Sequence, residues 1–146
     1  MKIIVDADAC PVKDIIVKTA KNFKLPVLMV ADTSHIINDG YSDVMTISQG
    51  RDAVDIALIN ETRKGDIVIT QDYGVASMAL SKQAYAMHHN GFLYNEDNMD
   101  RLMFERYIGQ KVRRAGGRTK GPQKRNKEDD RRFETALLEL CRKISL

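Results

Sequence analysis

The chain opens with MKIIVDADACPVKD at residues 1–14, and this stretch decides how the fold begins. The β-branched residues 3–5 predict a short buried strand, because such side chains pack well in a sheet. The strand runs directly into two carboxylates, Asp6 and Asp8. Carboxylates at a low-dielectric edge are costly unless something positive neutralises them. The opening motif therefore raises the question of which cation these two aspartates meet.

Length and composition predict a soluble globular protein of one domain, residues 1–146. Its 43% hydrophobic and 29% charged residues are ordinary for this class. No apolar run approaches the roughly 18 residues of a membrane span, and the short run after Lys2 is not typical of a signal peptide. Cys10 and Cys141 form no CxxC pair, which favours a reducing cytoplasm over a disulfide framework or a zinc site. We expect a cytoplasmic protein that does not enter a membrane.

Charge is distributed unevenly along the chain. Residues 1–100 carry 9 Lys/Arg against 14 Asp/Glu, whereas residues 101–146 carry 14 against 6. An acidic body with a basic tail indicates that the two parts contact different groups. The predicted partner is RNA or another phosphate-bearing ligand. Such a ligand would contact a metal on the acidic body and the cations of the basic tail.

The first 94 residues alternate between strand-like and helix-like periodicity. This alternation predicts βαβ units and an α/β fold, a three-layer sandwich with a mainly parallel central sheet. One helix is expected to begin at Pro11, a second to run from Asp52 to Gly65, and a third to span residues 72–83. Strands are expected at residues 2–6, 27–31, 44–47 and 66–70, with a weak fifth at 84–88 and a short sixth at 92–94.

Residues 95–146 form a basic helical extension of this α/β core. A basic amphipathic helix is predicted over residues 98–114, followed by a glycine-containing charged loop over 115–130 whose first part, 115–127, is expected to be flexible. The final helix is predicted over 131–144, with one apolar stripe formed by Phe133, Leu137, Leu138 and Cys141.

The predicted topology sorts the acidic residues, because open parallel sheets bind ligands beyond the carboxyl ends of their strands. Four aspartates follow predicted strands and are expected at that edge: Asp6, Asp8, Asp32 and Asp72. Asp43 and Asp66 begin their strands, so they are expected at the opposite edge.

Asp52 and Asp55 open the helix after the third strand and share one helical face. Together with the strand-end aspartates they form a repulsive cluster. A hard divalent cation relieves that repulsion and prefers oxygen ligands, so Mg²⁺ or Mn²⁺ is the predicted cofactor. Such an ion polarises a phosphoryl oxygen and activates water, so no protein nucleophile is needed.

Several of these acids also have a structural interpretation. Asp52 is a candidate N-cap, with Asp55 completing a capping-box-like arrangement. Asp72 is a candidate cap of the following helix, and Asp32 is a candidate loop start. The pair at residues 6 and 8 is harder to explain in this way, because a cap needs one acid.

Cations crowd the stretch after the first helix of the extension. Candidate phosphate contacts are Arg113, Arg114, Arg118, Lys120, Lys124 and Arg125. The alternative interpretation is a solvated charged loop. Lys13, in the first turn of the first helix, either pairs with Asp6 and Asp8 or contacts a phosphate. Cys10 is interpreted as a small packing residue.

Four motifs together resemble the YaiI/YqxD family of uncharacterised bacterial proteins: VDADACPVK, GRDAVDIAL, GDIVITQDYGVA and RRAGGRTKGP…RRFETAL. That family looks like a branch of the PIN-like superfamily, whose members are mostly metal-dependent ribonucleases. The resemblance implies that Asp6, Asp55 and Asp72 are the metal-binding acids and that Thr70 is the threonine of a T-x-D element. Asp8 and Asp52 belong to the motifs of the narrower family. The chain departs from ordinary PIN domains in its basic extension and in residues 73–74, where an Asp-Phe pair is common.

The leading hypothesis is a Mg²⁺- or Mn²⁺-dependent nuclease that acts on RNA, with Asp6, Asp55, Asp72 and Asp52 as metal ligands and with Asp8 among the catalytic acids. A haloacid-dehalogenase-like phosphatase is an alternative, in which Asp6 is the nucleophile and Asp8 the acid/base. A non-catalytic RNA-binding module is a third. A homo-oligomer is compatible with each of them.

Overall fold

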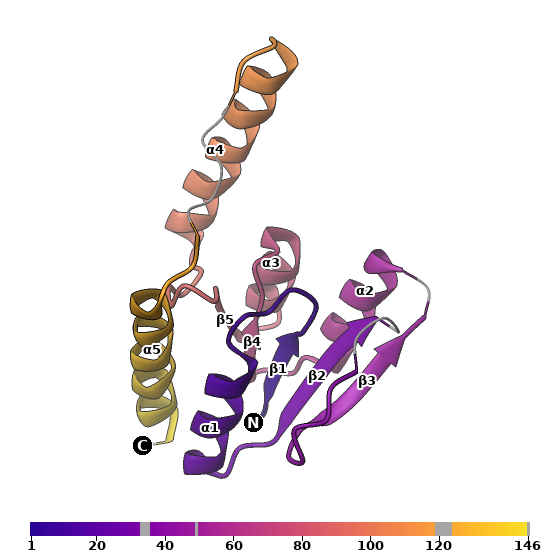
Figure 1. Cartoon of the computed structure of the whole chain (residues 1–146), viewed down its shortest axis with the longest axis vertical. Helices are drawn as coiled ribbons and strands as arrows, with labels where there is room; N and C mark the ends of the chain where they lie inside the picture. The colour runs from indigo at the N-terminus through magenta and orange to yellow at the C-terminus, as the bar shows by residue number, and fades with distance from the viewer. Residues whose placement is uncertain (33–35, 49, 119–123, 146) are drawn as a thin grey trace.

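The computed structural model describes residues 1–32, 36–48, 50–118 and 124–145. Its centre is a sheet of five strands, all parallel, in the order β3-β2-β1-β4-β5 (Figure 1). The strands are β1 (Ile3–Asp6), β2 (Val27–Asp32), β3 (Asp43–Ile47), β4 (Ile67–Ile69) and β5 (Tyr85–Met87). The predicted α/β fold is therefore confirmed.

Helices cover both faces of the sheet and make three layers (Figure 1). α1 (Lys13–Phe23) and α5 (Lys127–Ser145) lie side by side on one face. α2 (Arg51–Glu61) and α3 (Tyr73–Ser81) lie on the other. Successive side chains of β1 point to opposite faces, so Ile3 and Val5 join the core under α1 and α5, whereas Ile4 joins the core under α2 and α3. β1 is therefore covered by an apolar core on each face of the sheet. This explains why residues 3–5 are all hydrophobic instead of alternating with polar residues.

The chain reverses its path across the sheet between β1 and β4. It builds outward from β1 through β2 to β3, then returns to place β4 against the other side of β1. The ladder pairs Ile3 with Ile67 and Val5 with Ile69. The carboxyl ends of β1 and β4 are therefore adjacent at the switch point, where open α/β sheets form their ligand crevices.

α4 (Glu96–Arg114) extends away from this body (Figure 1). It begins with a reciprocal capping box, in which the side chains of Asn95 and Asn98 accept from each other's backbone N–H groups at 2.9 and 2.8 Å. None of its residues is buried. Within the described ranges, no helix has the length and apolar character needed to cross a membrane.

Several predicted elements near the sheet differ from the structure; for example, the helix predicted from Asp52 to Gly65 ends at Glu61. α1 begins at Lys13 rather than at Pro11, because its hydrogen-bond ladder starts from the carbonyl oxygen of Val12. Residues 92–94 form no strand, since Leu93 makes only an isolated antiparallel bridge to Met87. The sheet accordingly ends at β5 in the part of the chain that the structure describes.

The final helix begins four residues earlier than predicted, at Lys127. Asn126 and Asp129 exchange backbone-to-side-chain hydrogen bonds of 2.9 and 3.0 Å, which is the geometry of a capping box. The acidic run at 128–130 therefore belongs to the first turn of α5, where negative charge favours the helix dipole.

Candidate active site at the carboxyl edge of the sheet

Asp6 ends β1 with its side chain only 2% exposed, and an arginine holds it there. Arg51 donates from Nη1 to Oδ1 at 2.8 Å and from Nη2 to Oδ2 at 2.5 Å, a bidentate pair. Arg51 is the first residue of α2, and its N-cap Gly50 has a φ of 93°, which L side chains rarely adopt. The glycine thus allows the tight turn that starts α2.

The same guanidinium group reaches two further carboxylates. Its Nη1 lies 3.7 Å from Oδ2 of Asp8, and its Nη2 lies 3.4 Å from Oδ1 of Asp55, one helical turn away. The hydrogen bond to Asp6 raises the pKa of Arg51; burial opposes this effect, and nearby carboxylates add to it. In this structure the cation that neutralises the opening motif is therefore an arginine of the chain itself.

The sequence interpretation missed Arg51, although the GRDAVD motif contained the signal. An arginine four residues before an aspartate on a helix forms a favourable pair. That spacing indicates the contact with Asp55, but nothing in it indicates the bidentate contact with Asp6, 45 residues away.

Thr70 connects the ends of β1 and β4 through a short chain of hydrogen bonds. Its hydroxyl donates to Oδ2 of Asp6 at 2.9 Å and accepts from the backbone N–H of Asp72 at 3.0 Å. Asp72 is also the N-cap of α3, where Oδ1 accepts from Gly74 and Val75 at 2.8 and 3.1 Å. The capping interpretation of Asp72 is thus correct, and the residue also lines the candidate site.

Asp55 is the least compensated acid of the cluster. Its Oδ1 is buried without a hydrogen-bond donor, although the charge of Arg51 lies near. Burial raises the pKa of Asp55 to about 6; Arg51 opposes the rise, and the carboxylates of Asp72, Asp6 and Asp52 add to it. The site therefore carries more negative charge than one guanidinium comfortably balances.

A divalent cation is one candidate occupant of this acidic cluster. Among the described residues, no group of three or more acidic, histidine or cysteine side chains is placed to hold a metal ion. The Arg51 guanidinium group contacts the carboxylates of Asp8 and Asp55 instead. The donors are nevertheless all oxygen, as Mg²⁺ and Mn²⁺ require. Oδ1 of Asp55 is buried and accepts no hydrogen bond, so it is the kind of oxygen that would ligate such an ion. A hard divalent cation at this cluster would have to displace the Arg51 guanidinium group, which contacts the carboxylates of Asp6, Asp8 and Asp55.

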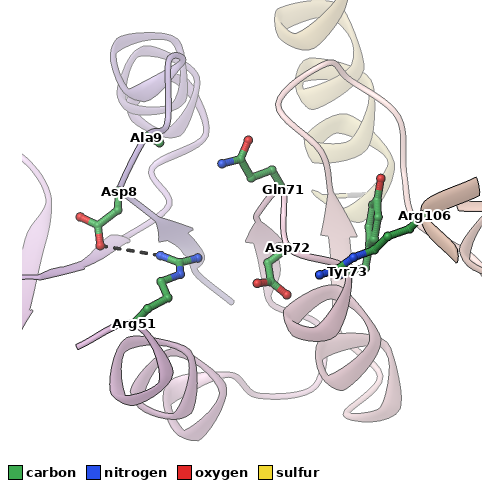
Figure 2. Close-up of a pocket in the computed structure, with 7 residues that line it drawn as sticks. All are labelled: Asp8, Ala9, Arg51, Gln71, Asp72, Tyr73 and Arg106. Atoms are coloured by element: carbon green, nitrogen blue, oxygen red, sulfur yellow. Dashed lines mark ion pairs between the residues drawn. The ribbon is translucent and has the colours of Figure 1, made fainter. Parts of the chain in front are cut away.

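The cluster borders an open pocket of about 530 Å³ (Figure 2). Arg51 and Asp8 lie on one side of it, and Gln71 and Asp72 lie on the other (Figure 2). Arg106 reaches in from α4 beside Tyr73. The pocket is therefore lined by two arginines, Arg51 and Arg106, together with the carboxylates of Asp8 and Asp72.

The remaining predicted acids lie around this centre. Asp52 is exposed in the first turn of α2; its capping interpretation is wrong, because Gly50 occupies the N-cap. Asp32 ends β2, and its backbone N–H donates to the carboxylate of Asp8 at 3.2 and 3.4 Å. Lys13 is half-buried at the start of α1. Burial raises the pKa of the nearby Cys10 thiol, and the charge of Lys13 only partly opposes this effect.

The acids excluded by the strand-direction rule are remote from the cluster. Asp43 begins β3. Asp66, which precedes β4, is buried and accepts from the backbone N–H of Lys2 at 3.1 Å, from Lys2 Nζ at 2.8 Å and from the backbone N–H of Arg63 at 2.8 Å. Asp66 is thus about as buried as Asp6, but it has a structural role at the opposite edge of the sheet.

The basic residues of the extension fall into two groups. Arg113, Arg114, Arg118 and Lys124 are exposed, and Lys120 lies outside the described residues. Arg125 is half-buried and donates to the carbonyl oxygen of His89 at 2.8 Å, to Asn90 at 2.9 Å and to Asp130 at 2.8 Å. Arg125 therefore fastens the start of α5 to the loop after β5.

Fold and site together define an α/β protein with a parallel doubly wound sheet, whose aspartates converge on an internal arginine at the switch point. The chain belongs to the YaiI/YqxD family, described as uncharacterised, whose sequence pattern matches residues 4–143. It is 61% identical over 138 residues to a UPF0178 protein of Ruminiclostridium cellulolyticum, covering 94% of this chain and 90% of that one. A UPF0178 protein of Clostridium acetobutylicum is 56% identical over 142 residues, with 96% of each chain covered. No solved structure was found to match the chain.

Proposed function

We propose that the protein is a metal-dependent nuclease that hydrolyses phosphodiester bonds in RNA, as the resemblance to PIN-like domains implies. The observation that carries the proposal is the convergence of Asp6, Asp55 and Asp72 at the switch point, with one buried oxygen of Asp55 lacking a donor. Such a concentration of carboxylates is poorly explained by packing alone, since burial and mutual repulsion disfavour it.

Asp6, Asp55 and Asp72 would hold Mg²⁺ or Mn²⁺, with Asp52 at the rim. Such an ion supplies the polarisation of a phosphoryl oxygen and the activation of water. Thr70 fixes the orientation of Asp6 through its 2.9 Å hydrogen bond and restrains the backbone of Asp72. Asp8 lines the pocket and, in this proposal, would orient water or accept its proton.

The two pocket arginines bind the substrate in this proposal. Arg51 is 43% exposed and lines the pocket, so its guanidinium group is accessible to the non-bridging oxygens of a phosphate. Arg106 faces the same space from α4. The exposed cations at 113, 118 and 124 would contact the RNA backbone further away, and such contacts weaken as salt concentration rises.

The phosphatase alternative also assigns its chemistry to Asp6. Both carboxylate oxygens of Asp6 accept hydrogen bonds from Arg51, and Oδ2 accepts a third from Thr70. A nucleophilic Asp6 and a metal-ligating Asp6 both require Arg51 to release this carboxylate, so these bonds do not separate the two hypotheses. An RNA-binding module without activity remains as an outcome of the test.

The test compares two buried aspartates at opposite edges of the sheet. Asp6→Asn removes a proposed ligand, and Asp66→Asn is the matched control, since the two residues are 5% and 2% exposed. With single-stranded RNA and Mn²⁺, we expect the wild type and Asp66→Asn to cleave the RNA and Asp6→Asn not to cleave it. Adding a chelator should abolish the cleavage. Circular dichroism checks that both variants fold.

The outcomes are distinct. RNA binding without turnover by the wild type, in the presence of Mg²⁺ or Mn²⁺, would identify a binding module and contradict the nuclease. Full cleavage by Asp6→Asn would show that the activity comes from elsewhere or from a contaminant. Calorimetric titration of Mn²⁺ into both variants tests the metal separately, with binding expected for Asp66→Asn and lost for Asp6→Asn.

A further inference from the structure

Among the described residues, the long helix α4 packs against the body only through a few side chains near its start, such as Met99 and Leu102. It spans 19 residues, and none of them is buried. Most helical stability in proteins comes from packing an apolar face, so a helix with few buried contacts depends on a partner for much of its stability. Its described supports are local: the capping box at Asn95 and the Arg101–Glu105 ion pair at 4.0 Å.

α4 nevertheless carries large apolar side chains into solvent. Their exposed fractions run from 37% to 63%, and the residues are Met103, Phe104, Tyr107, Ile108 and Val112. Soluble monomers rarely leave such a contiguous group uncovered, and a group of this kind marks an interaction surface. The question is which partner covers it.

The helix has an inner and an outer face. Met99 and Leu102 pack against the core under α2 and α3, and Arg106 points into the pocket. With 3.6 residues per turn, a different set of residues lies away from the body. These outer-face residues, all exposed, are Asp97, Asp100, Phe104, Tyr107, Lys111 and Arg114.

The outer face repeats with alternating spacings of three and four residues, the spacing of coiled-coil seams. Its chemistry is also self-complementary when the direction is reversed. The first two positions are acidic, the middle two aromatic and the last two basic. About a centre between residues 105 and 106, an antiparallel copy places Asp97 opposite Arg114 and Asp100 opposite Lys111. Phe104 then meets Tyr107.

We propose that the outer face of α4 binds the outer face of α4 in a second copy of this chain, in antiparallel orientation. Charge complementarity selects this partner, because the acidic and basic halves satisfy each other only across a two-fold axis. Antiparallel alignment also places opposite ends of the helix dipoles together. Met103 and Ile108 flank the aromatic centre and extend the apolar contact.

A nucleic acid fits this face less well than a second copy does. The exposed carboxylates of Asp97 and Asp100 would lie along the path of a phosphate backbone that followed the outer face, and like charges would repel. Within one chain, the Lys111 ammonium lies 5.0 Å from the centroid of the Tyr107 ring, so this cation already contacts an aromatic residue of the outer face. The candidate active site opens toward the inner face, so pairing of α4 leaves it accessible.

The central test measures oligomeric state by sedimentation velocity over a concentration series. We expect a wild-type dimer that weakens as salt concentration rises. Phe104→Glu places a charge in the aromatic centre and should weaken association at least about 30-fold, or about 2 kcal/mol. The matched control is Ile56→Glu on α2, since Ile56 is 62% exposed and Phe104 is 63% exposed. This control should associate as the wild type does.

Orientation is tested by disulfide cross-linking of chains that carry one new cysteine each. Asp97→Cys and Arg114→Cys should cross-link when the two variants are mixed and hardly at all when each is alone, because antiparallel pairing brings residue 97 to residue 114. Both native cysteines, Cys10 and Cys141, are replaced by serine in this background after circular dichroism has shown that the replacement folds.

The proposal is overturned if the wild type stays monomeric at every concentration, or if Phe104→Glu and Ile56→Glu associate equally. It is also overturned if association appears only when RNA is added, since the face would then serve the nucleic acid. Cross-linking of Asp97→Cys with itself would refute the antiparallel geometry. None of these measurements depends on catalysis, so they stand apart from the test of the nuclease.

Discussion

Replacing Arg51 with methionine is the most direct perturbation of the acidic cluster. The substitution keeps much of the aliphatic stem and removes the guanidinium group that joins Asp6, Asp8 and Asp55. Asp6, whose side chain is 2% exposed, would retain only the 2.9 Å hydrogen bond from Thr70 among the bonds described for its carboxylate. A buried charge would thus lose its counter-ion.

The size of the effect follows from burial. Removing one partner of a buried ion pair costs about 3–5 kcal/mol, because it leaves an uncompensated charge. Arg51 is 43% exposed, so water re-solvates part of the site, and we expect a loss of about 2–3 kcal/mol in the free energy of unfolding. For a chain of this size, that corresponds to a fall of about 5–10 °C in Tm.

Urea unfolding with and without Mn²⁺ provides the assay. Because the guanidinium group no longer competes for the carboxylates, Mn²⁺ should stabilise Arg51→Met more than it stabilises the wild type. In a double-mutant cycle with Asp6→Asn, the double variant should lose less stability than the two single losses together, since neither charge remains unpaired. An Arg51→Met variant as stable as the wild type, with an equal response to Mn²⁺, would refute this account of the cluster.

Two pH dependences follow from the shifted carboxyl and imidazole groups, each measured by urea unfolding as a difference between variant and wild type. Asp55 has its pKa raised from 3.8 to about 6, chiefly by burial, so the unfolded chain loses this proton first as pH rises and the contribution of Asp55 to stability falls between those values. Asp55→Asn should therefore gain stability relative to the wild type from about pH 4 to pH 6, and a flat difference would contradict the assignment. His88 stacks on Phe92 at 4.7 Å, and burial, helped by His89 and Arg125, lowers its pKa from 6.5 to about 4. The unfolded chain then binds the proton first as pH falls, so the wild type should lose stability relative to His88→Phe between pH 6.5 and 4; equal slopes for both proteins would show that His88 is not shifted.

The sequence determined the sheet and the edge at which the site lies. Continuous apolar runs predicted β1 and β4, because strands buried on both faces show no polar alternation. The direction of those strands then separated Asp6 and Asp72 from Asp66, since every parallel strand presents its carboxyl end at the same edge. These are properties of neighbouring residues and chain direction, which a sequence states directly. The start of α1 differs from prediction because its N-cap, Val12, makes no side-chain cap hydrogen bond that a sequence could indicate. The start of α5 differs because Asn126 is one of several nearby polar residues able to cap a helix.

Only the tertiary structure decided how the acidic cluster is balanced and which side chains are left uncovered. Arg51 and Asp6 are 45 residues apart and meet because α2 begins at the edge where β1 ends. In the sequence, Arg125 is not distinguished from the other cations of its segment. Only the structure shows that it donates hydrogen bonds to His89 and Asn90. A charge is neutralised by whatever lies within a few ångströms of it, and that distance is set by the packing of whole elements rather than by the order of residues along the chain.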